Sequence, residues 1–258
     1  MSMKGVPWGR LSLIIRTFQE DEQEREMQMI TTILWDVDGT LLDFQYSQRH
    51  ALAKCFQTAG LTMTEDILAR YSEINDRYWK RLELGEITKQ QLLTGRFRTL
   101  FEECGIEGVD LDAFLREYQE GLGNIFCYID DSITICKSLQ GKVKQYVITN
   151  GVTSTQKNKL QLSGLAACME ELFISEEIGT PKPGKAFFDA CLARVEEKDK
   201  RRILVVGDSL SSDIKGGVLA GLKTCWYRPE GAVNHTEYQA DYQISDLHQI
   251  MDVLTQQP

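Results

Sequence analysis

The sequence predicts an α/β fold, in which a parallel sheet carries helices on its faces and an all-helical cap domain is inserted into the sheet domain. Apolar, β-branched segments alternate with helical ones, which is the order of a parallel sheet. About a hundred residues separate the first two apolar segments. Because a crossover between parallel strands needs only a dozen or so residues, this stretch must be an insertion.

The expected strands are five short apolar segments, and helical segments separate most of them. The strands are expected at residues 31–35, 143–149, 172–175, 203–206 and 224–227. The helices between them are expected at residues 154–162, 185–195 and 212–220. Ligands of parallel sheets bind beyond the carboxyl ends of the strands, so the residues that follow these segments are the candidates for a functional site.

The insertion is helical in pattern, with apolar residues three and four positions apart. Its helices are expected at residues 47–58, 64–83, 88–103 and 111–127, with Gly60, Gly85 and Gly105 as stops. The predicted domains are an extension outside the fold (1–29), a core (30–43 and 132–258) and a cap (44–131). The two linkers are expected near residues 43–44 and 130–131.

Composition limits the partners and the compartment. A net charge of -9 argues against nucleic acid or an anionic membrane as the main partner and leaves a small anionic metabolite possible. Seven cysteines without a Cys-x-x-Cys pair favour reduced thiols and a cytoplasmic protein. No apolar run approaches the ~20 residues that span a bilayer.

The run Asp36-Val37-Asp38-Gly39-Thr40 directly follows the first expected strand. Side chains at positions i and i+2 of a strand point to the same side, so both carboxylates are expected to face one small space. Their mutual repulsion would be relieved by a divalent metal and an incoming phosphate ester. A surface turn that uses Asp and Gly as turn formers explains the segment equally well.

Three further segments follow expected strands or precede expected helices. They are Thr149-Asn150-Gly151, the Lys182 segment Thr180-Pro181-Lys182-Pro183-Gly184, and Gly207-Asp208 with Asp213 at the start of the next helix. Each has an ordinary explanation as a turn, a solvated lysine or a helix N-cap. Coincidence is a poor explanation for all of them at the carboxyl ends of one sheet, and together they predict a site.

The order Asp-x-Asp-x-Thr, Thr-Asn-Gly, Lys-Pro and Gly-Asp-x-x-x-x-Asp resembles the four motifs of the haloacid dehalogenase-like hydrolase superfamily, over about residues 31 to 230. The resemblance implies a Rossmann-like core with a helical cap inserted after the first motif. Shorter strings are similar to the YjjG-type pyrimidine 5'-nucleotidases. They lie at residues 40–44, 95–97, 148–151, 174–179 and 220–226.

The resemblance implies a role for each catalytic residue. Asp36 is the expected nucleophile, which forms an aspartyl-phosphate, and Asp38 is the acid and base that serves the leaving oxygen and then the attacking water. Thr149 and the Asn150 N–H are expected to bind the phosphoryl oxygens. Lys182 is expected to offset the charge that Asp36 and the phosphate share.

The resemblance also implies a magnesium site. The expected ligands are the Asp36 and Asp208 carboxylates and the backbone carbonyl of Asp38, with Asp213 supporting the water shell. All are hard oxygen donors that suit octahedral Mg²⁺. An enzyme that cleaves carbon–halogen bonds has little use for Asp38, because halide departs without a proton. Its presence therefore favours phosphate ester hydrolysis.

The expected function is a Mg²⁺-dependent phosphatase for a small phosphomonoester, most similar to a pyrimidine 5'-nucleotidase and acting as a monomer or homodimer. A phosphoglycolate or sugar-phosphate phosphatase, a phosphomutase and a non-catalytic receiver-like module are the alternatives. The long insertion and the second Asp argue against the receiver-like module.

Substrate choice is expected to lie in the cap, which must close over the site. The candidates for contacting a base or sugar are Phe44, Tyr46, Trp79, Arg96 and Phe97. For each of them, a place in the core or on the surface of the helical cap is the more ordinary explanation. The histidines have no motif around them and are expected to be structural or solvated. They are His50, His235 and His248.

Overall fold

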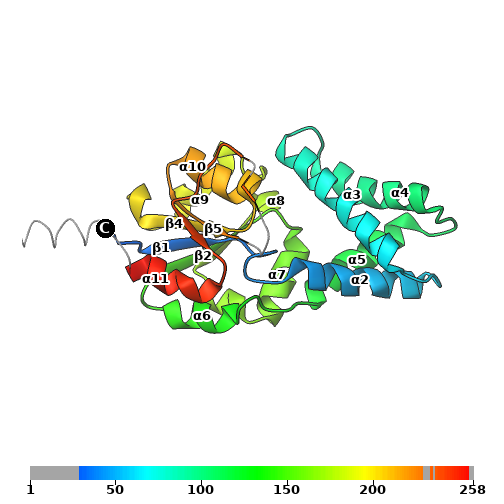
Figure 1. The fold of residues 1–258 in the computed structure, drawn as a ribbon, viewed down its shortest axis with the longest axis horizontal. Helices are drawn as coiled ribbons and strands as arrows, with labels where there is room; N and C mark the ends of the chain where they lie inside the picture. The colour runs from blue at the N-terminus through cyan, green and yellow to red at the C-terminus, as the bar shows by residue number, and fades with distance from the viewer. Residues whose placement is uncertain (1–28, 229–232, 235, 256–258) are drawn as a thin grey trace, which may run out of the picture.

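The structure, a computed structural model, describes residues 29–228, 233–234 and 236–255. It consists of a sheet with helices on both faces and a second, helical body at one end of that sheet (Figure 1). This confirms the predicted fold class. The expected N-terminal extension, apart from Met29, and the histidine at position 235 lie outside the described residues.

The core is a six-stranded parallel sheet with strand order β3-β2-β1-β4-β5-β6. The strands are β1 (Thr32–Trp35), β2 (Lys144–Thr149), β3 (Glu171–Ile174), β4 (Ile203–Gly207), β5 (Lys223–Tyr227) and β6 (Tyr242–Ile244). The first five match the expected strands within one residue at each end. The sixth, at the sheet edge, was not predicted from the sequence.

The central strand β1 is buried on both faces, which is why its sequence is a continuous apolar run rather than an alternating one. The α-helices of the sheet domain are α6 (Ser132–Leu139), α7 (Thr153–Leu162), α8 (Ser175–Ile178), α9 (Lys185–Arg194), α10 (Lys215–Ala220) and α11 (Ile250–Thr255). Ile33 and Trp35 pack into one core cluster with residues of α6, α7 and α11, whereas Leu34 packs into another with residues of α9 and α10.

The cap has four helices and a hydrophobic core of its own. They are α2 (Phe44–Thr58), α3 (Glu65–Glu83), α4 (Lys89–Cys104) and α5 (Leu111–Asn124). Local signals set their ends: Thr88 and Gln91 form a capping box at the start of α4, and Gly105 ends α4 with φ 63°. The last cap helix ends at Asn124, three residues earlier than expected.

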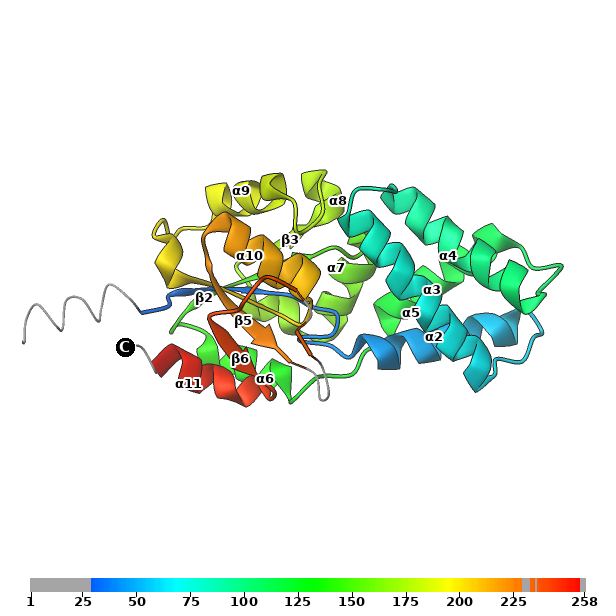
Figure 2. The same cartoon turned by 45° about the horizontal axis from the view of Figure 1, so that its top comes forward.

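Two connections join the cap to the sheet domain, and they lie side by side. Leu42 forms an antiparallel bridge with Tyr128, and the Asp43 N–H donates to the Cys127 carbonyl oxygen at 2.9 Å. The first connection follows β1 directly, so the cap stands beyond the carboxyl ends of the strands (Figure 2).

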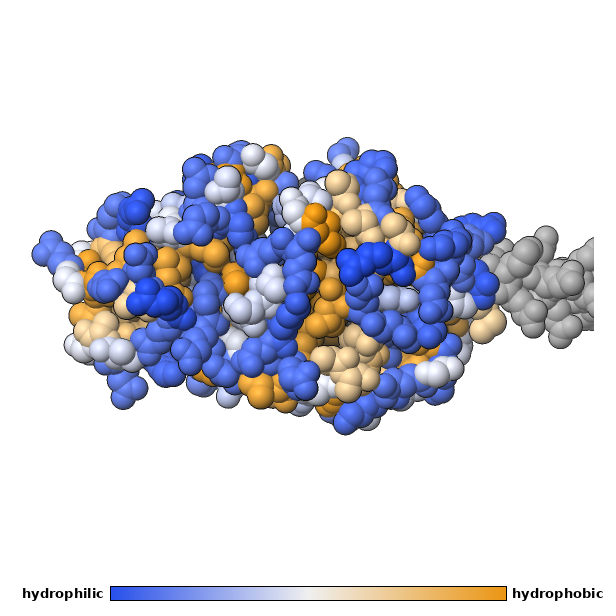
Figure 3. Space-filling view, turned by 180° about the vertical axis from the view of Figure 1, so that it is seen from behind, coloured by the Kyte–Doolittle hydropathy of each residue, from blue (hydrophilic) through white to orange (hydrophobic). Residues whose placement is uncertain are grey.

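Polar residues cover much of the face shown in Figure 3, with apolar residues between them. Within the described part of the chain, no helix combines the length and the apolar character needed to cross a bilayer.

Candidate active site

The predicted site residues meet at the carboxyl ends of β1, β2 and β4, which are neighbours in the sheet. One cavity of ≈ 230 Å³ opens there, between the sheet and the cap. The structure brings all of the predicted site residues into its wall. They are Asp36, Asp38, Thr149, Asn150, Lys182, Asp208 and Asp213.

Asp36 follows the last residue of β1 and is only 7% exposed. Its N–H donates to the Val206 carbonyl oxygen of β4 at 2.9 Å, which extends the sheet pairing by one residue. The Thr40 hydroxyl lies 3.4 Å from a carboxylate oxygen of both Asp36 and Asp208 and accepts the Asp208 N–H at 3.0 Å. Thr40 therefore ties the first motif to the loop after β4.

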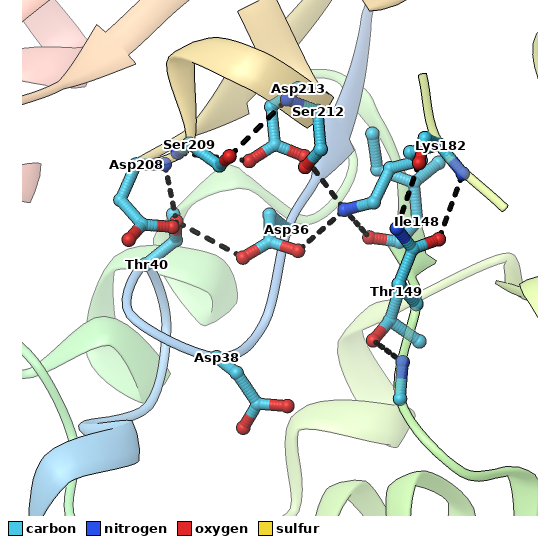
Figure 4. A network of polar contacts seen from close by, with 12 residues as sticks. Asp36, Asp38, Thr40, Ile148, Thr149, Lys182, Asp208, Ser209, Ser212 and Asp213 are labelled. Carbon is cyan, nitrogen blue, oxygen red and sulfur yellow. Dashed lines mark hydrogen bonds and ion pairs between the residues drawn. The ribbon is translucent and has the colours of Figure 1, made fainter. Parts of the chain in front are cut away.

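Lys182 reaches the acidic group from one side, and its ammonium lies between Asp36 and Asp213 (Figure 4). Its ammonium, in a side chain 2% exposed, lies 2.6 Å from Asp36 Oδ1 and 2.7 Å from Asp213 Oδ1. It also donates to the Ile148 carbonyl oxygen at 2.9 Å. Burial disfavours the ammonium, but Asp213 and Asp36 outweigh burial and raise the pKa of Lys182.

The Asn150 side chain explains how the Lys182 backbone is held. Its amide oxygen accepts the Lys182 N–H at 2.8 Å, and its amide nitrogen donates to the Lys182 carbonyl oxygen at 3.0 Å. Lys182 lies in the loop just before α9, which begins at Lys185 as expected.

Asp213 differs from the sequence prediction. It lies within a π-helical turn (Leu210–Ile214) rather than at the start of α10, and the Ile214 N–H reaches back to the Ser209 carbonyl oxygen. The Asp213 Oδ2 atom accepts the Ser209 N–H at 3.2 Å. The turn thereby aims the carboxylate into the cavity instead of leaving it as a surface N-cap.

The three carboxylates can converge on one small space. One oxygen each of Asp36, Asp208 and Asp213 lies within 4.8 Å of the others. Burial raises the pKa of Asp36 to about 7 although Lys182 opposes the rise, and burial and Asp36 raise the pKa of Asp208 well above its usual range. One ammonium cannot balance three carboxylates, so this set of hard oxygen donors suits a divalent cation.

Asp38 has different surroundings, and its carboxylate points away from the acidic group (Figure 4). It accepts from Lys159 Nζ and from Gln156 Nε2, each at 2.6 Å. Both residues belong to α7 and are buried. The sequence prediction missed them, although their spacing of three residues places them on one face of an expected helix.

The cap closes the cavity with one face of α3. Asn75, Asp76, Trp79 and Glu83 line it, together with Phe44 of α2. Glu83 accepts from the Ser211 hydroxyl at 2.6 Å, which joins the cap to the loop after β4. Lys89 at the start of α4 donates to the Asn150 carbonyl oxygen and is a second contact of this kind.

The five cap residues proposed for substrate contact separate into three groups. Phe44 and Trp79 line the cavity. Arg96 and Phe97 are buried in the cap interior, and Tyr46 lies on the surface beside another hollow. Of the candidates in the 95–97 segment, neither Arg96 nor Phe97 lines the cavity.

A larger hollow of ≈ 600 Å³ lies where α5 meets α7. None of the seven predicted site residues lines it. Converging charge marks the smaller cavity as the candidate active site, because volume alone provides no chemistry.

Comparison with known proteins agrees with this geometry. Residues 30–221 match the family model of the haloacid dehalogenase-like hydrolases. The chain is 36% identical to the HAD-hydrolase YfnB of Bacillus subtilis (strain 168), over 88% of this chain and 97% of YfnB. It is 34% identical to the pyrimidine 5'-nucleotidase PynA of Streptococcus pneumoniae, over 86% and 94% of the two chains. A crystal structure of YfnB bound to magnesium superposes with a TM-score of 0.82 at 35% identity, covering 88% of this chain and 99% of YfnB.

Proposed function

The chain belongs to the haloacid dehalogenase-like hydrolases, and from this premise we propose that it is a Mg²⁺-dependent phosphatase for pyrimidine nucleoside 5'-monophosphates. One observation carries the proposal: Asp36 and Asp38 line the same cavity but have different partners. Asp36 is held by Lys182 within an acidic group, whereas Asp38 lies between Lys159 and Gln156. Two carboxylates in different surroundings can perform two different tasks.

Asp36 is the proposed nucleophile. A carboxylate oxygen of Asp36 bonds to phosphorus, the ester bond to the leaving oxygen breaks, and an aspartyl-phosphate forms. Lys182 offsets the charge that builds up on the phosphoryl group, and Thr149 and the Asn150 N–H bind phosphoryl oxygens. The Asn150 side chain is bound to the Lys182 backbone, so it is the backbone N–H of Asn150 that would bind the phosphoryl oxygen.

Asp38 is the proposed acid and base. It gives a proton to the departing oxygen and later takes one from the water that hydrolyses the aspartyl-phosphate. Lys159 and Gln156 each bind one of its carboxylate oxygens, so they restrict its rotation. Their contacts keep the proton-transfer group apart from the nucleophile.

Asp36 and Asp208 would hold Mg²⁺, with the Asp38 backbone carbonyl as a third ligand and Asp213 supporting the water shell. The bound cation would neutralise charge on the transferring phosphoryl group. The convergence of these carboxylates and the raised pKa values of Asp36 and Asp208 support the fit.

Relatives support the substrate class. PynA is named a pyrimidine 5'-nucleotidase, and so is YjjG of Escherichia coli (strain K12). YjjG is 32% identical to this chain, over 86% of this chain and 96% of YjjG. We place the enzyme in the cytoplasm, which its seven free cysteines support, because an oxidising compartment favours disulfides.

Phosphate release tests the proposal. With Mg²⁺ present, we expect faster release from deoxyuridine and thymidine monophosphates than from phosphoglycolate or hexose phosphates. Asp36→Asn should abolish release while the protein still folds, as circular dichroism would report. Asp189→Asn, at an exposed position of α9, is the matched control and should retain activity. Normal activity in Asp36→Asn would refute the nucleophile assignment, and preference for phosphoglycolate would refute the substrate class.

A further inference from the structure

We propose that Asn75 and Asp76 of α3 bind the hydrogen-bonding edge of the pyrimidine base while Trp79 contacts the ring, and that buried Arg96 fixes the orientation of Asn75. This inference rests on the proposed nucleotidase function and assigns the residues that select the base. Asn75, Asp76 and Arg96 lie outside the catalytic motifs, and only Arg96 has a place in the segments that resemble known nucleotidases.

The wall opposite the catalytic residues is one face of α3. Asn75, Trp79 and Glu83 are four residues apart, and such residues lie above one another on a helix. All three line the cavity, as does Asp76 next to them. A substrate whose phosphate sits at Asp36 must therefore direct the rest of its structure toward this face.

Arg96 determines which way the Asn75 amide points. Arg96 Nη1 lies 2.8 Å from Asn75 Oδ1. A guanidinium has only donors, so the amide atom that faces it must be the oxygen. The Asn75 amide nitrogen is thereby turned away from Arg96. Burial raises the pKa of the Asp76 carboxyl, and the Lys80 ammonium and a hydrogen bond from Asn75 oppose the rise. Asp76 is an exposed residue of α3 that also lines the cavity.

The surroundings of Arg96 satisfy its buried charge only in part. Its side chain is 1% exposed among the rings of Tyr71, Phe97 and Tyr118, and its Nε and Nη2 atoms have no hydrogen-bond partner. Within the described residues it forms no ion pair with a carboxylate. A buried charge without such a partner is costly, and contacts with aromatic faces offset only part of that cost. Its one hydrogen bond leads to Asn75 in the cavity wall, so we infer that Arg96 is a positioning residue.

The Asn75 amide nitrogen is a hydrogen-bond donor, and the Asp76 carboxylate beside it is an acceptor. Together they complement a base edge that presents an acceptor next to a donor. Uracil and thymine present a carbonyl oxygen next to N3–H, and cytosine presents N3 next to its amino group. Phosphoglycolate offers a carboxylate instead, which Asp76 and Glu83 would repel. The Trp79 ring lies in the cavity wall with the Lys89 ammonium 4.8 Å from its centroid, and the cavity of ≈ 230 Å³ favours a single-ring base.

A matched set of substrates tests the inference. Deoxyuridine monophosphate and its N3-methyl derivative differ only in the N3–H donor, and deoxyribose 5-phosphate lacks the base. For the wild type, kcat/KM should fall at least about tenfold on N3-methylation, the loss expected for a hydrogen bond to a charged acceptor. In Asp76→Ala the ratio between the two nucleotides should approach one.

Substitutions at Arg96 separate positioning from stability. Arg96→Met should reduce the ratio of kcat/KM between deoxyuridine monophosphate and its N3-methyl derivative, and the change should appear in KM. The unfolding temperature should not fall, because the substitution removes an unpaired buried charge. Arg96→Lys keeps a donor and should restore the ratio. Arg98→Met, the same change at an exposed position of α4, should alter neither quantity.

Each alternative outcome has a clear meaning. Equal hydrolysis of the two nucleotides by the wild type would overturn the inference and leave the phosphatase function intact. An Arg96→Met protein that unfolds at lower temperature with an unchanged ratio would show that Arg96 is structural, and would also overturn it. No phosphate release from any of the three substrates with Mg²⁺ present would overturn the proposed function itself.

Discussion

Removal of the Lys182 ammonium should destabilise the metal-free protein in a pH-dependent way. Lys182→Met keeps much of the side-chain volume but removes the charge that lies 2.6 Å from Asp36 and 2.7 Å from Asp213. The variant then holds Asp36, Asp208 and Asp213 within one small space without a cation. The mutual repulsion and the burial of these three carboxylates lower the free energy of unfolding.

The magnitude follows from the burial of these groups. Removing one partner of a buried ion pair costs about 3–5 kcal/mol. A chain of this size loses about 2–4 °C of unfolding temperature per kcal/mol. We therefore expect Lys182→Met to unfold about 6–20 °C below the wild type at pH 8 in a chelator.

The difference in unfolding temperature between Lys182→Met and the wild type should be smaller at low pH. Burial already raises the pKa of Asp36 to about 7 in the folded protein, and removing Lys182 raises it further. An acid whose folded pKa lies above its unfolded pKa makes folding less favourable as pH rises through that interval. At pH 5 the Asp36 carboxyl is protonated and part of the repulsion disappears.

Differential scanning calorimetry at pH 5 and pH 8 measures both effects. Lys185→Met changes an exposed lysine three residues later and should stay within about 0.5 kcal/mol of the wild type. An unfolding temperature unchanged in Lys182→Met, or a loss equal at both pH values, would refute the electrostatic reasoning.

Three further predictions address the site. Gly39→Ala and Gly85→Ala both place a side chain at positive φ, but only the Gly39 Cβ would lie 2.6 Å from an Asp208 oxygen; both should lose stability in thermal melts, and only Gly39→Ala should lose phosphate release. Lys159→Met should lower kcat by about tenfold, because Asp38 loses the ion pair that holds its carboxylate in place; an unchanged kcat would contradict this. Mg²⁺ at about 100 times its Kd should stabilise the wild type by about 2.7 kcal/mol, and calorimetry should find no such gain in Asp208→Asn.

Most of the fold could be predicted from the sequence, because the signals that define its strands and helices lie within or next to those elements. The apolar runs of β1 and β4 and the caps of α3 and α4 each lie within a few residues of the element they define. The edge strand β6 has three residues and pairs only with β5, so it lacks a run long enough to recognise. The π-helical turn at Asp213 depends on tertiary contacts, since Lys182 holds the carboxylate from another loop.

The parts of the site that escaped prediction depend on contacts between distant segments. Gln156 and Lys159 are 118 and 121 residues away from Asp38 in the chain, and only the packing of α7 beneath the first loop brings them together. The role of Arg96 also depends on such a contact, whereas the sequence made Arg96 a candidate for touching the substrate itself. The structure places it behind Asn75, where any influence on the substrate passes through another residue.

The Asp36 and Asp38 pair shows why an alternation rule fails at the end of a strand. The rule places side chains i and i+2 on one side, but β1 ends at Trp35, and Gly39 at φ 95° turns the chain within four residues. Both carboxylates still line the cavity, yet Asp36 faces Lys182 and Asp38 faces Lys159. Separate cations remove the repulsion that first suggested a shared metal. A Mg²⁺ site is instead indicated by Asp36, Asp208 and Asp213, which each place one oxygen within 4.8 Å of the others, while the Lys182 ammonium pairs with Asp36 and Asp213. The turn after β1 thus creates two electrostatic settings from two neighbouring aspartates, as a separate nucleophile and acid–base group require.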